Sequence, residues 1–155
     1  MSDLLLYLHV LGAMVLMGTG IGIAFFMAVA NLGADPARIA PVSAIVVLAD
    51  TVFTAPAALL QPVTGTLLAL DRGWPLTEPW LLAAAALYLV VGAFWLPVVW
   101  MQIRLRDMAR AALAEGRPLP AAYHRLYRLW FACGIPAFAA MLAIIALMLT
   151  RPAFG

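Results

Sequence analysis

Four long apolar runs, separated by short polar segments, dominate the pattern along the chain. Each run exceeds the roughly 18 apolar residues that indicate an α-helix able to cross a bilayer. The pattern therefore predicts an all-α, integral membrane four-helix bundle that occupies residues 1–155 as one transmembrane domain. Its helices are expected at about residues 4–30, 39–70, 79–114 and 121–149.

Prolines and glycines inside two of the runs predict bent helices. Pro56 and Pro62 interrupt the second run, whereas Gly134 and Pro136 interrupt the fourth. Proline lacks a helical N–H donor, so a carbonyl one turn earlier needs another partner, from a neighbouring helix or a hydroxyl. We expect kinks in helices 2 and 4. The hydroxyls best placed to serve the second helix belong to Thr51, Thr54 and Thr64.

The composition supports a membrane environment. Of the 155 residues, 66% are hydrophobic and only 10% are charged, whereas a soluble domain carries roughly a quarter charged residues. So few charges do not cover a surface that faces water, and we expect the lipid bilayer to surround most of the chain. No basic run interleaved with aromatic residues is present, which argues against nucleic-acid binding.

The basic residues, all of them arginine, predict the orientation in the membrane. In a four-helix chain the first and third loops share one side. That side and its flanks hold seven arginines, and the other side holds two, Arg72 and Arg151. Because basic loops remain in the cytoplasm, we expect a multi-pass protein of the bacterial cytoplasmic (inner) membrane with both termini on the non-cytoplasmic side. The aromatic residues expected at the two membrane interfaces are Tyr7, Trp74, Trp80, Trp100, Tyr123, Tyr127 and Trp130.

An ionisable group inside a membrane is costly and is a functional candidate by default. His9 lies about two turns into the first helix, in the expected outer leaflet. It is a candidate ligand of a metal or a heme iron, and the alternative is a packing histidine that hydrogen bonds across helices. Met148 has a similar expected depth. A His9–Met148 pair would suit heme b or copper, although methionine is also an ordinary packing residue.

The remaining histidine and the single cysteine favour simpler roles. His124 is expected in the opposite leaflet, roughly 20 Å from His9 in a hydrocarbon core of about 30 Å. One heme iron therefore does not bind both histidines, and lipid contacts explain His124. Cys133, inside the fourth run, is expected to be a packing residue.

Asp50 is the most informative single residue, because it interrupts the second apolar run. At 100° per residue, Asp50, Thr54, Gln61 and Thr64 form one polar stripe that should face the bundle. A structural ion pair between Asp50 and Arg104 or Arg128 is the leading interpretation, and a proton or cation relay is the alternative. A second polar cluster, suited to a small ligand, is expected among His9, Gln61, Thr64 and Tyr88.

Two glycines on the first helix suggest close helix packing. Gly18 and Gly22 lie four residues apart on one face, and small residues at this spacing let helices approach closely. Packing within the bundle is favoured over a dimer interface. The sequence shows no nucleophile triad, cysteine metal spacing, Walker motif or carboxylate pair, so it leaves open whether the chain is an enzyme.

Three segments resemble one bacterial membrane family. Residues 8–13 (LHVLGA) with Gly18–Gly22, residues 61–65 (QPVTG) and residues 123–136 are similar to the group catalogued as domain of unknown function 2269. That group is distantly similar to the copper-resistance D proteins and to the membrane protoporphyrinogen oxidase that works with heme. The shared first-helix histidine corresponds to His9. The resemblance implies heme or metal binding there, while the chain has no lysine and no second intramembrane histidine.

Three functions from different classes follow. The first is a small heme- or metal-binding redox protein that uses His9. The second is a metal- or ion-transporting protein with a path through His9, Met148 and the Asp50 stripe. The third is an accessory subunit, or a homo-oligomer, whose lateral faces contact another membrane protein.

Overall fold

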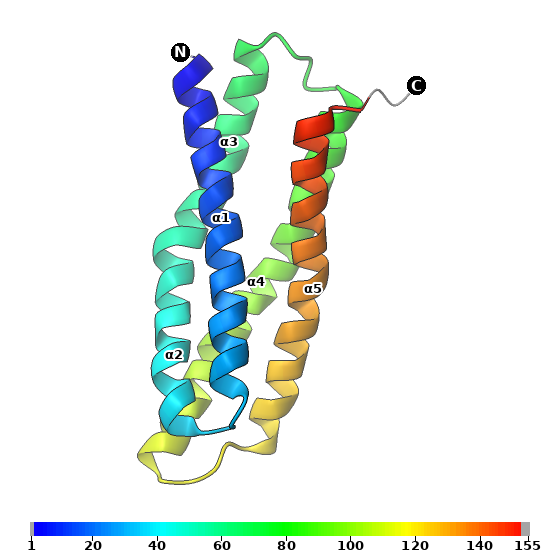
Figure 1. Ribbon diagram of the computed structural model, residues 1–155. Coiled ribbons are helices and arrows are strands. Elements are labelled where there is room, and N and C mark those ends of the chain that lie inside the picture. Colours follow the sequence, from blue (N-terminus) through cyan, green and yellow to red (C-terminus); the bar gives the residue numbers. More distant parts are fainter. Residues whose placement is uncertain (1, 153–155) are drawn as a thin grey trace.

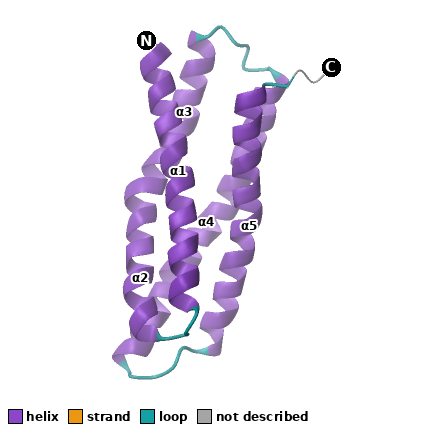
Figure 2. Cartoon of the chain, viewed as in Figure 1, coloured by secondary structure: helices purple, strands orange, loops and turns teal. Residues whose placement is uncertain are grey.

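The computed structural model describes residues 2–152, which form helices joined by short connections (Figure 2). The elements are α1 (Ser2–Asn31), α2 (Pro36–Ala49), a π-helix η1 (Asp50–Thr54), α3 (Ala55–Asp71), α4 (Pro79–Ala114) and α5 (Ala121–Thr150). Because α2, η1 and α3 follow one another without a gap, they make one span, and the chain has four spans long and apolar enough to cross a membrane. The predicted all-α four-helix architecture is confirmed; the domain expected over residues 1–155 extends beyond the described residues at both ends.

The helix boundaries agree closely with the sequence except at the start of α2. This helix begins at Pro36, three residues before the expected start at residue 39. The Asp35 carboxylate accepts a hydrogen bond from the Ala37 backbone N–H at 2.9 Å, which caps the helix. Pro36 occupies the first helical position, where its missing N–H leaves no carbonyl unpaired.

The two prolines of the second span act differently. Before Pro56 the helix widens into η1, where the Ala55 N–H donates to the Asp50 carbonyl five residues earlier. Pro62 leaves the Ala58 carbonyl without its helical donor, and the Tyr88 hydroxyl of α4 donates to it. The expectation that threonine hydroxyls serve this role is therefore wrong at Pro62: the Thr64 hydroxyl donates to the Leu60 carbonyl instead, at 2.9 Å. In the fourth span, α5 remains helical through Pro136.

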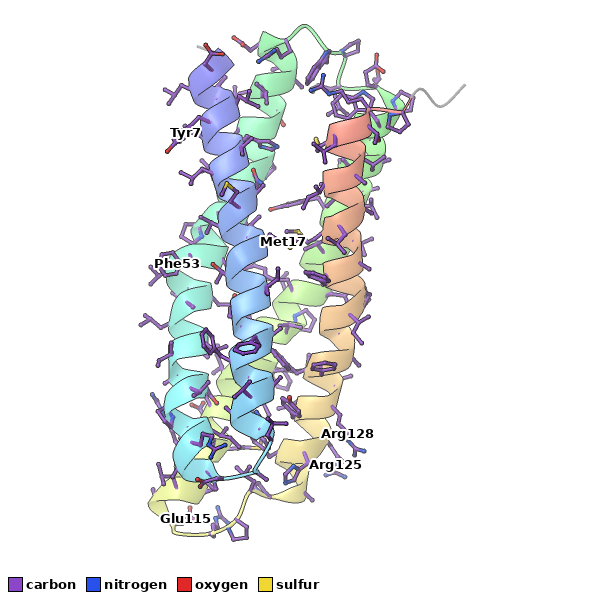
Figure 3. The ribbon with its side chains drawn as sticks, viewed as in Figure 1. Tyr7, Met17, Phe53, Glu115, Arg125 and Arg128 are labelled. Carbon is purple, nitrogen blue, oxygen red and sulfur yellow. The ribbon has the colours of Figure 1, made fainter. Side chains whose placement is uncertain are left out.

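The two ends of the bundle differ in charge. The start of α1, the end of α5 and the α3–α4 loop lie at one end, called the termini end below (Figure 1). The α1–α2 and α4–α5 loops lie at the other, called the arginine end, where Figure 3 places Glu115, Arg125 and Arg128. Tyr7 lies near the termini end.

The helices pack tightly at the arginine end and diverge towards the termini end (Figure 1). The main buried cluster joins α1, α2, α4 and α5 near the arginine end, and Met27, Ile39, Leu105 and Tyr123 are completely inaccessible. The Tyr123 hydroxyl donates to Asn31 Oδ1 at 2.9 Å and ties α5 to the end of α1. Towards the termini, α3 packs along α1 and α4 packs along α5.

The outer surface of the described helices is largely apolar. Many large apolar side chains on every span are exposed, which is unfavourable in water and favourable in lipid. Examples are Phe25, Leu48, Leu59, Leu89 and Leu149. Three of the aromatic residues expected at the membrane interfaces have side chains buried between helices, namely Trp80, Tyr123 and Trp130. Their large rings fill space inside the bundle, and their depth in the membrane stays a prediction.

Candidate functional site

The structure brings His9 together with two polar residues of α3. His9 Nδ1 lies 3.0 Å from Thr64 Oγ1, and the Thr64 hydroxyl donates to the Leu60 carbonyl at 2.9 Å. Gln61, one helical turn before Thr64, completes the cluster, and both α3 side chains are buried while the imidazole is half-buried. We call His9, Gln61 and Thr64 the histidine cluster. It lies in the half of the bundle nearer the termini, where α1 packs along α3 (Figure 1).

Gln61 joins this cluster to the backbone of α1. Its amide lies between the His9 carbonyl and the Ala13 N–H, two groups that a regular α-helix joins to each other. The orientation assigned from the hydrogen-bond network lets Gln61 Nε2 donate to the His9 carbonyl at 3.0 Å and Oε1 accept from the Ala13 nitrogen at 2.9 Å. A buried amide is thereby satisfied at both ends, which fixes the approach of α3 to α1.

Two glycines make room for these contacts. A Cβ atom on Gly65 would lie 3.0 Å from His9 Cε1, so the imidazole ring edge rests directly against the α3 backbone. A Cβ on Gly12 would lie 3.4 Å from the Gln61 side chain. Gly12 lies in segment 8–13 and Gly65 lies in segment 61–65. In the fold these two segments face each other and form the two sides of one contact between α1 and α3.

The neighbours of His9 Nδ1 favour opposite tautomers of the ring. Thr64 Oγ1 directs its own proton to Leu60 and so offers Nδ1 a lone pair, which requires a proton on Nδ1. Gln61 Nε2 lies 2.9 Å from Nδ1 and offers an N–H, which requires a lone pair there. Within residues 2–152, no side chain hydrogen bonds to Nε2. The tautomer of the ring therefore depends on which of these two contacts Nδ1 makes.

Met148 receives no contact that would pair it with His9. The polar contacts of His9 come from α3, whereas Met148 is a half-buried residue of α5, a helix that meets α1 sparsely. Beside the histidine cluster, a shallow apolar groove of about 340 Å³ separates α1 from η1 and the start of α3. Leu8, Gly12, Phe53 and Leu60 are among its lining residues.

A second polar cluster surrounds Asp50 near the middle of the second span. Thr54 of η1 and Trp95 and Gln102 of α4 lie beside the Asp50 carboxylate. Asp50, Thr54 and Gln102 are buried. Asp50 Oδ2, Thr54 Oγ1, Trp95 Nε1 and Gln102 Oε1 are buried atoms that lack a hydrogen-bond partner among the described residues. We call these four residues the aspartate cluster; the sequence pattern had not indicated Trp95 or Gln102 as members.

The ion pair expected for Asp50 does not form. Arg104 and Arg128 are exposed, while Asp50 is only 4% exposed. Among residues 2–152 the ion pairs join Arg106 to Asp107 and Arg117 to Glu115. An arginine side chain is long enough to carry its charge to the membrane–water interface, so these two arginines do not need a buried partner.

The structure separates Tyr88 from the histidine cluster to which the sequence assigned it. Its hydroxyl donates a hydrogen bond to the Ala58 carbonyl, and Ala58 lies between Asp50 and Gln61 along the second span. Tyr88 therefore links α4 to α3 where the two helix pairs diverge. The expected stripe of Asp50, Thr54, Gln61 and Thr64 is buried throughout, but the wide turn of η1 divides it into two clusters.

Other residues singled out in the sequence lie away from both clusters. His124 is exposed at the arginine end and contacts the Tyr123 ring edge-on. Cys133 packs partly buried against the main core. Gly18 is exposed, with no heavy atom within 4 Å of an added Cβ, and Gly22 meets only Phe26 of its own helix. Packing within the bundle is therefore the wrong explanation for this pair.

The fold and its two intramembrane polar clusters define a multi-pass integral membrane protein with four helical spans. Residues 3–152 match the family described as "Predicted integral membrane protein (DUF2269)". The chain belongs to this family. No curated protein and no solved structure matched it, so the distant likeness to copper-resistance D proteins and to the heme-dependent oxidase is not shown.

Proposed function

We propose that the protein binds heme through His9 Nε2 and acts as a small membrane redox protein. The observation that carries this proposal is the one-sided environment of the ring. Thr64 Oγ1 is placed to accept from an Nδ1–H, one ring edge rests on Gly65, and Nε2 has no hydrogen-bond partner among the described residues. A histidine that ligates a metal is usually held in this way, with its other ring nitrogen hydrogen bonded by the protein.

The donor set favours heme over a bare metal ion. Within the described chain, no three His, Cys, Asp or Glu residues come close enough to hold a metal together. Zinc and copper sites built by protein alone need three or four such ligands. A porphyrin supplies four nitrogens itself, so one histidine suffices. Copper bound by a His9–Met148 pair receives no support from the contacts between α1 and α5.

Each residue of the histidine cluster has a role in this proposal. With Nε2 as the ligand atom, Nδ1 would keep its hydrogen and donate a hydrogen bond to Thr64 Oγ1, while the Thr64 hydroxyl donates a hydrogen bond to the Leu60 carbonyl. Gln61 fixes the α1 backbone at His9, and Gly65 supports the ring edge. Bound heme would supply one-electron transfer, which no side chain of the cluster provides alone.

The distribution of arginine supports one orientation of this cluster in the membrane. We propose that the arginine end faces the cytoplasm of a bacterial inner membrane, since it carries seven of the nine arginines of the chain. The histidine cluster would then lie in the leaflet away from the cytoplasm. Electrons would be exchanged with partners at that surface or within the bilayer.

The visible spectrum of purified protein tests the proposal. Protein is produced in heme-replete cells, extracted in detergent and examined for a Soret band. We expect the wild type to carry heme and His9→Ala to lose it. His124→Ala is the matched control because it removes the other histidine, which is exposed, and it should keep the band. A wild-type protein without a Soret band, even after incubation with hemin, would refute heme binding.

A further inference from the structure

The aspartate cluster carries an inference that is independent of heme. Its polar atoms come from two spans, Asp50 and Thr54 from η1, and Trp95 and Gln102 from α4. Asp50, Thr54 and Gln102 are 4%, 7% and 2% exposed. One oxygen of each and the Trp95 indole nitrogen lack a partner among the described residues. A buried polar group without a partner costs about 1–3 kcal/mol, so four in one place indicate a binding site rather than a packing defect.

The chemistry of these atoms favours a cation. Three of the four are oxygens, a carboxylate, a hydroxyl and an amide carbonyl, and all three can accept or coordinate; the Thr54 hydroxyl and the Trp95 N–H can also donate. When ionised, the carboxylate is negative, and neither ion pair found in residues 2–152 includes it. Water satisfies hydrogen bonds but leaves this charge uncompensated in the hydrocarbon. A cation both coordinates the oxygens and neutralises the charge.

The number of carboxylates selects the class of cation. Divalent ions such as Ca²⁺ are held by oxygen sets that include several carboxylates. In the described chain no three His, Cys, Asp or Glu residues come together to hold a metal, and the side chains that lie beside the Asp50 carboxylate, those of Thr54, Trp95 and Gln102, are neutral. One carboxylate with neutral oxygens balances one positive charge. The oxygen ligands also exclude the soft ions that prefer sulfur.

We propose that Asp50, Thr54 and Gln102 form a buried binding site for one monovalent cation of the sodium type. The wide turn of η1 contributes by placing Asp50 and Thr54, four residues apart, on the same buried face. Such π-turns occur frequently at functional sites. The Trp95 indole nitrogen lies beside the carboxylate and gives the cluster a neutral N–H donor. Because the site joins η1 to α4, its occupancy couples the middle of the second span to the third.

Ion-specific stabilisation tests this site. The detergent-solubilised protein is unfolded thermally in sodium chloride and in choline chloride at equal ionic strength, with intrinsic tryptophan fluorescence as the signal. A ligand that binds only the folded state raises Tm in a saturable manner. We expect sodium to raise the wild-type Tm by about 3–6 °C at saturation. Asp50→Asn should abolish this shift, whereas Asp107→Asn, an exposed carboxylate paired with Arg106, should retain it.

Two further measurements keep the test decisive. If Asp50→Asn does not fold, Thr54→Val and Gln102→Leu each remove one neutral oxygen and should require at least tenfold more sodium for half of the Tm shift. Equal Tm values for the wild type in sodium and choline would overturn the proposal. So would an infrared carboxylic-acid band, unaffected by sodium, that is lost in a folded Asp50→Asn variant, because a proton would then occupy the site. A sodium shift that persists unchanged in the Asp50 variant would place the ion elsewhere.

Discussion

The imidazole ring of His9 rests against Gly65, such that a single added carbon on α3 would lie 3.0 Å from His9 Cε1. This contact joins the first and second spans at the level of the histidine cluster. It sets the position of the ring as firmly as the hydrogen bonds do, because neither the ring edge nor the helix backbone is able to move without disturbing the packing of α1 on α3.

Gly65→Ala tests this contact. The new methyl group has to displace the imidazole, and such overpacking costs about 1–3 kcal/mol, so we expect a lower Tm together with reduced heme content. Gly18→Ala is the matched control because an added Cβ there meets no heavy atom within 4 Å. It should be neutral or slightly stabilising, since alanine favours the helix. A Gly65→Ala protein as stable and as heme-loaded as the control would show that the ring is not confined by α3.

Gln61→Leu and Thr64→Val should shift the His9 tautomer in opposite directions. Removing the Gln61 N–H eliminates the neighbour that favours a lone pair on Nδ1, so the Nδ1–H form should increase. Removing the Thr64 hydroxyl eliminates the acceptor for that proton, so the Nε2–H form should increase. Histidine ¹⁵N NMR of the heme-free protein in detergent reports the tautomer directly, with exposed His124 as an internal reference. An unchanged His9 signal in both variants would disprove the assigned network.

Tyr88→Phe should destabilise the bundle where its helix pairs diverge. The variant leaves the Ala58 carbonyl without a donor, because Pro62 has no N–H to offer it. An unsatisfied buried carbonyl costs about 1–3 kcal/mol, which predicts a lower Tm and weaker coupling between α3 and α4. Tyr7→Phe is the control, since Tyr7 is 63% exposed. If both variants unfold at the wild-type temperature, the link from Tyr88 to Ala58 contributes no stability.

Reporter fusions test the proposed orientation. With the arginine end in the cytoplasm, alkaline phosphatase fused to the C-terminus should be active in bacteria, and green fluorescent protein fused there should be dark. Fusions within the α4–α5 loop at Arg117 should give the reverse result. The opposite pattern would place the histidine cluster in the cytoplasmic leaflet and reverse the proposed direction of electron exchange.

The spans were predictable from the sequence because hydrocarbon imposes one simple requirement on the chain. An apolar run of sufficient length has to become a helix that satisfies its own backbone. The predicted ends of the third helix coincide with α4, Pro79–Ala114. The start of α2 was missed because a single side-chain cap, Asp35, extends that helix by three residues beyond its apolar run.

The membership of the two clusters was only partly predictable. His9, Gln61 and Thr64 were identified because polar groups inside a span are rare and have to face the bundle. Gly12 and Gly65 were not assigned a role, because their importance depends on the rotation of α1 and α3 relative to each other. The sequence did offer one signal for a role of these glycines: Gly12 lies in the same short segment as His9, and Gly65 lies in the same short segment as Gln61 and Thr64.

Asp50 shows where reasoning from a straight helix fails. An ideal turn of 100° per residue places Asp50, Thr54, Gln61 and Thr64 on one stripe, but η1 adds a wide turn inside it. No residue of Asp50–Thr54 requires a π-helix by its propensity, and the π-helix ends two residues before Pro56. The two clusters, one with an imidazole Nε2 and one with oxygens that no described residue hydrogen bonds, emerge only from the folded chain.

Chemical rescue tests the ligand role of His9 most directly. His9→Gly removes the imidazole but leaves the polypeptide otherwise intact, and the purified variant is incubated with hemin in the presence or absence of free imidazole. We expect no stable heme spectrum without imidazole and a wild-type-like spectrum when imidazole is added. A His9→Gly protein that binds hemin as the wild type does, without imidazole, would show that His9 is not the ligand.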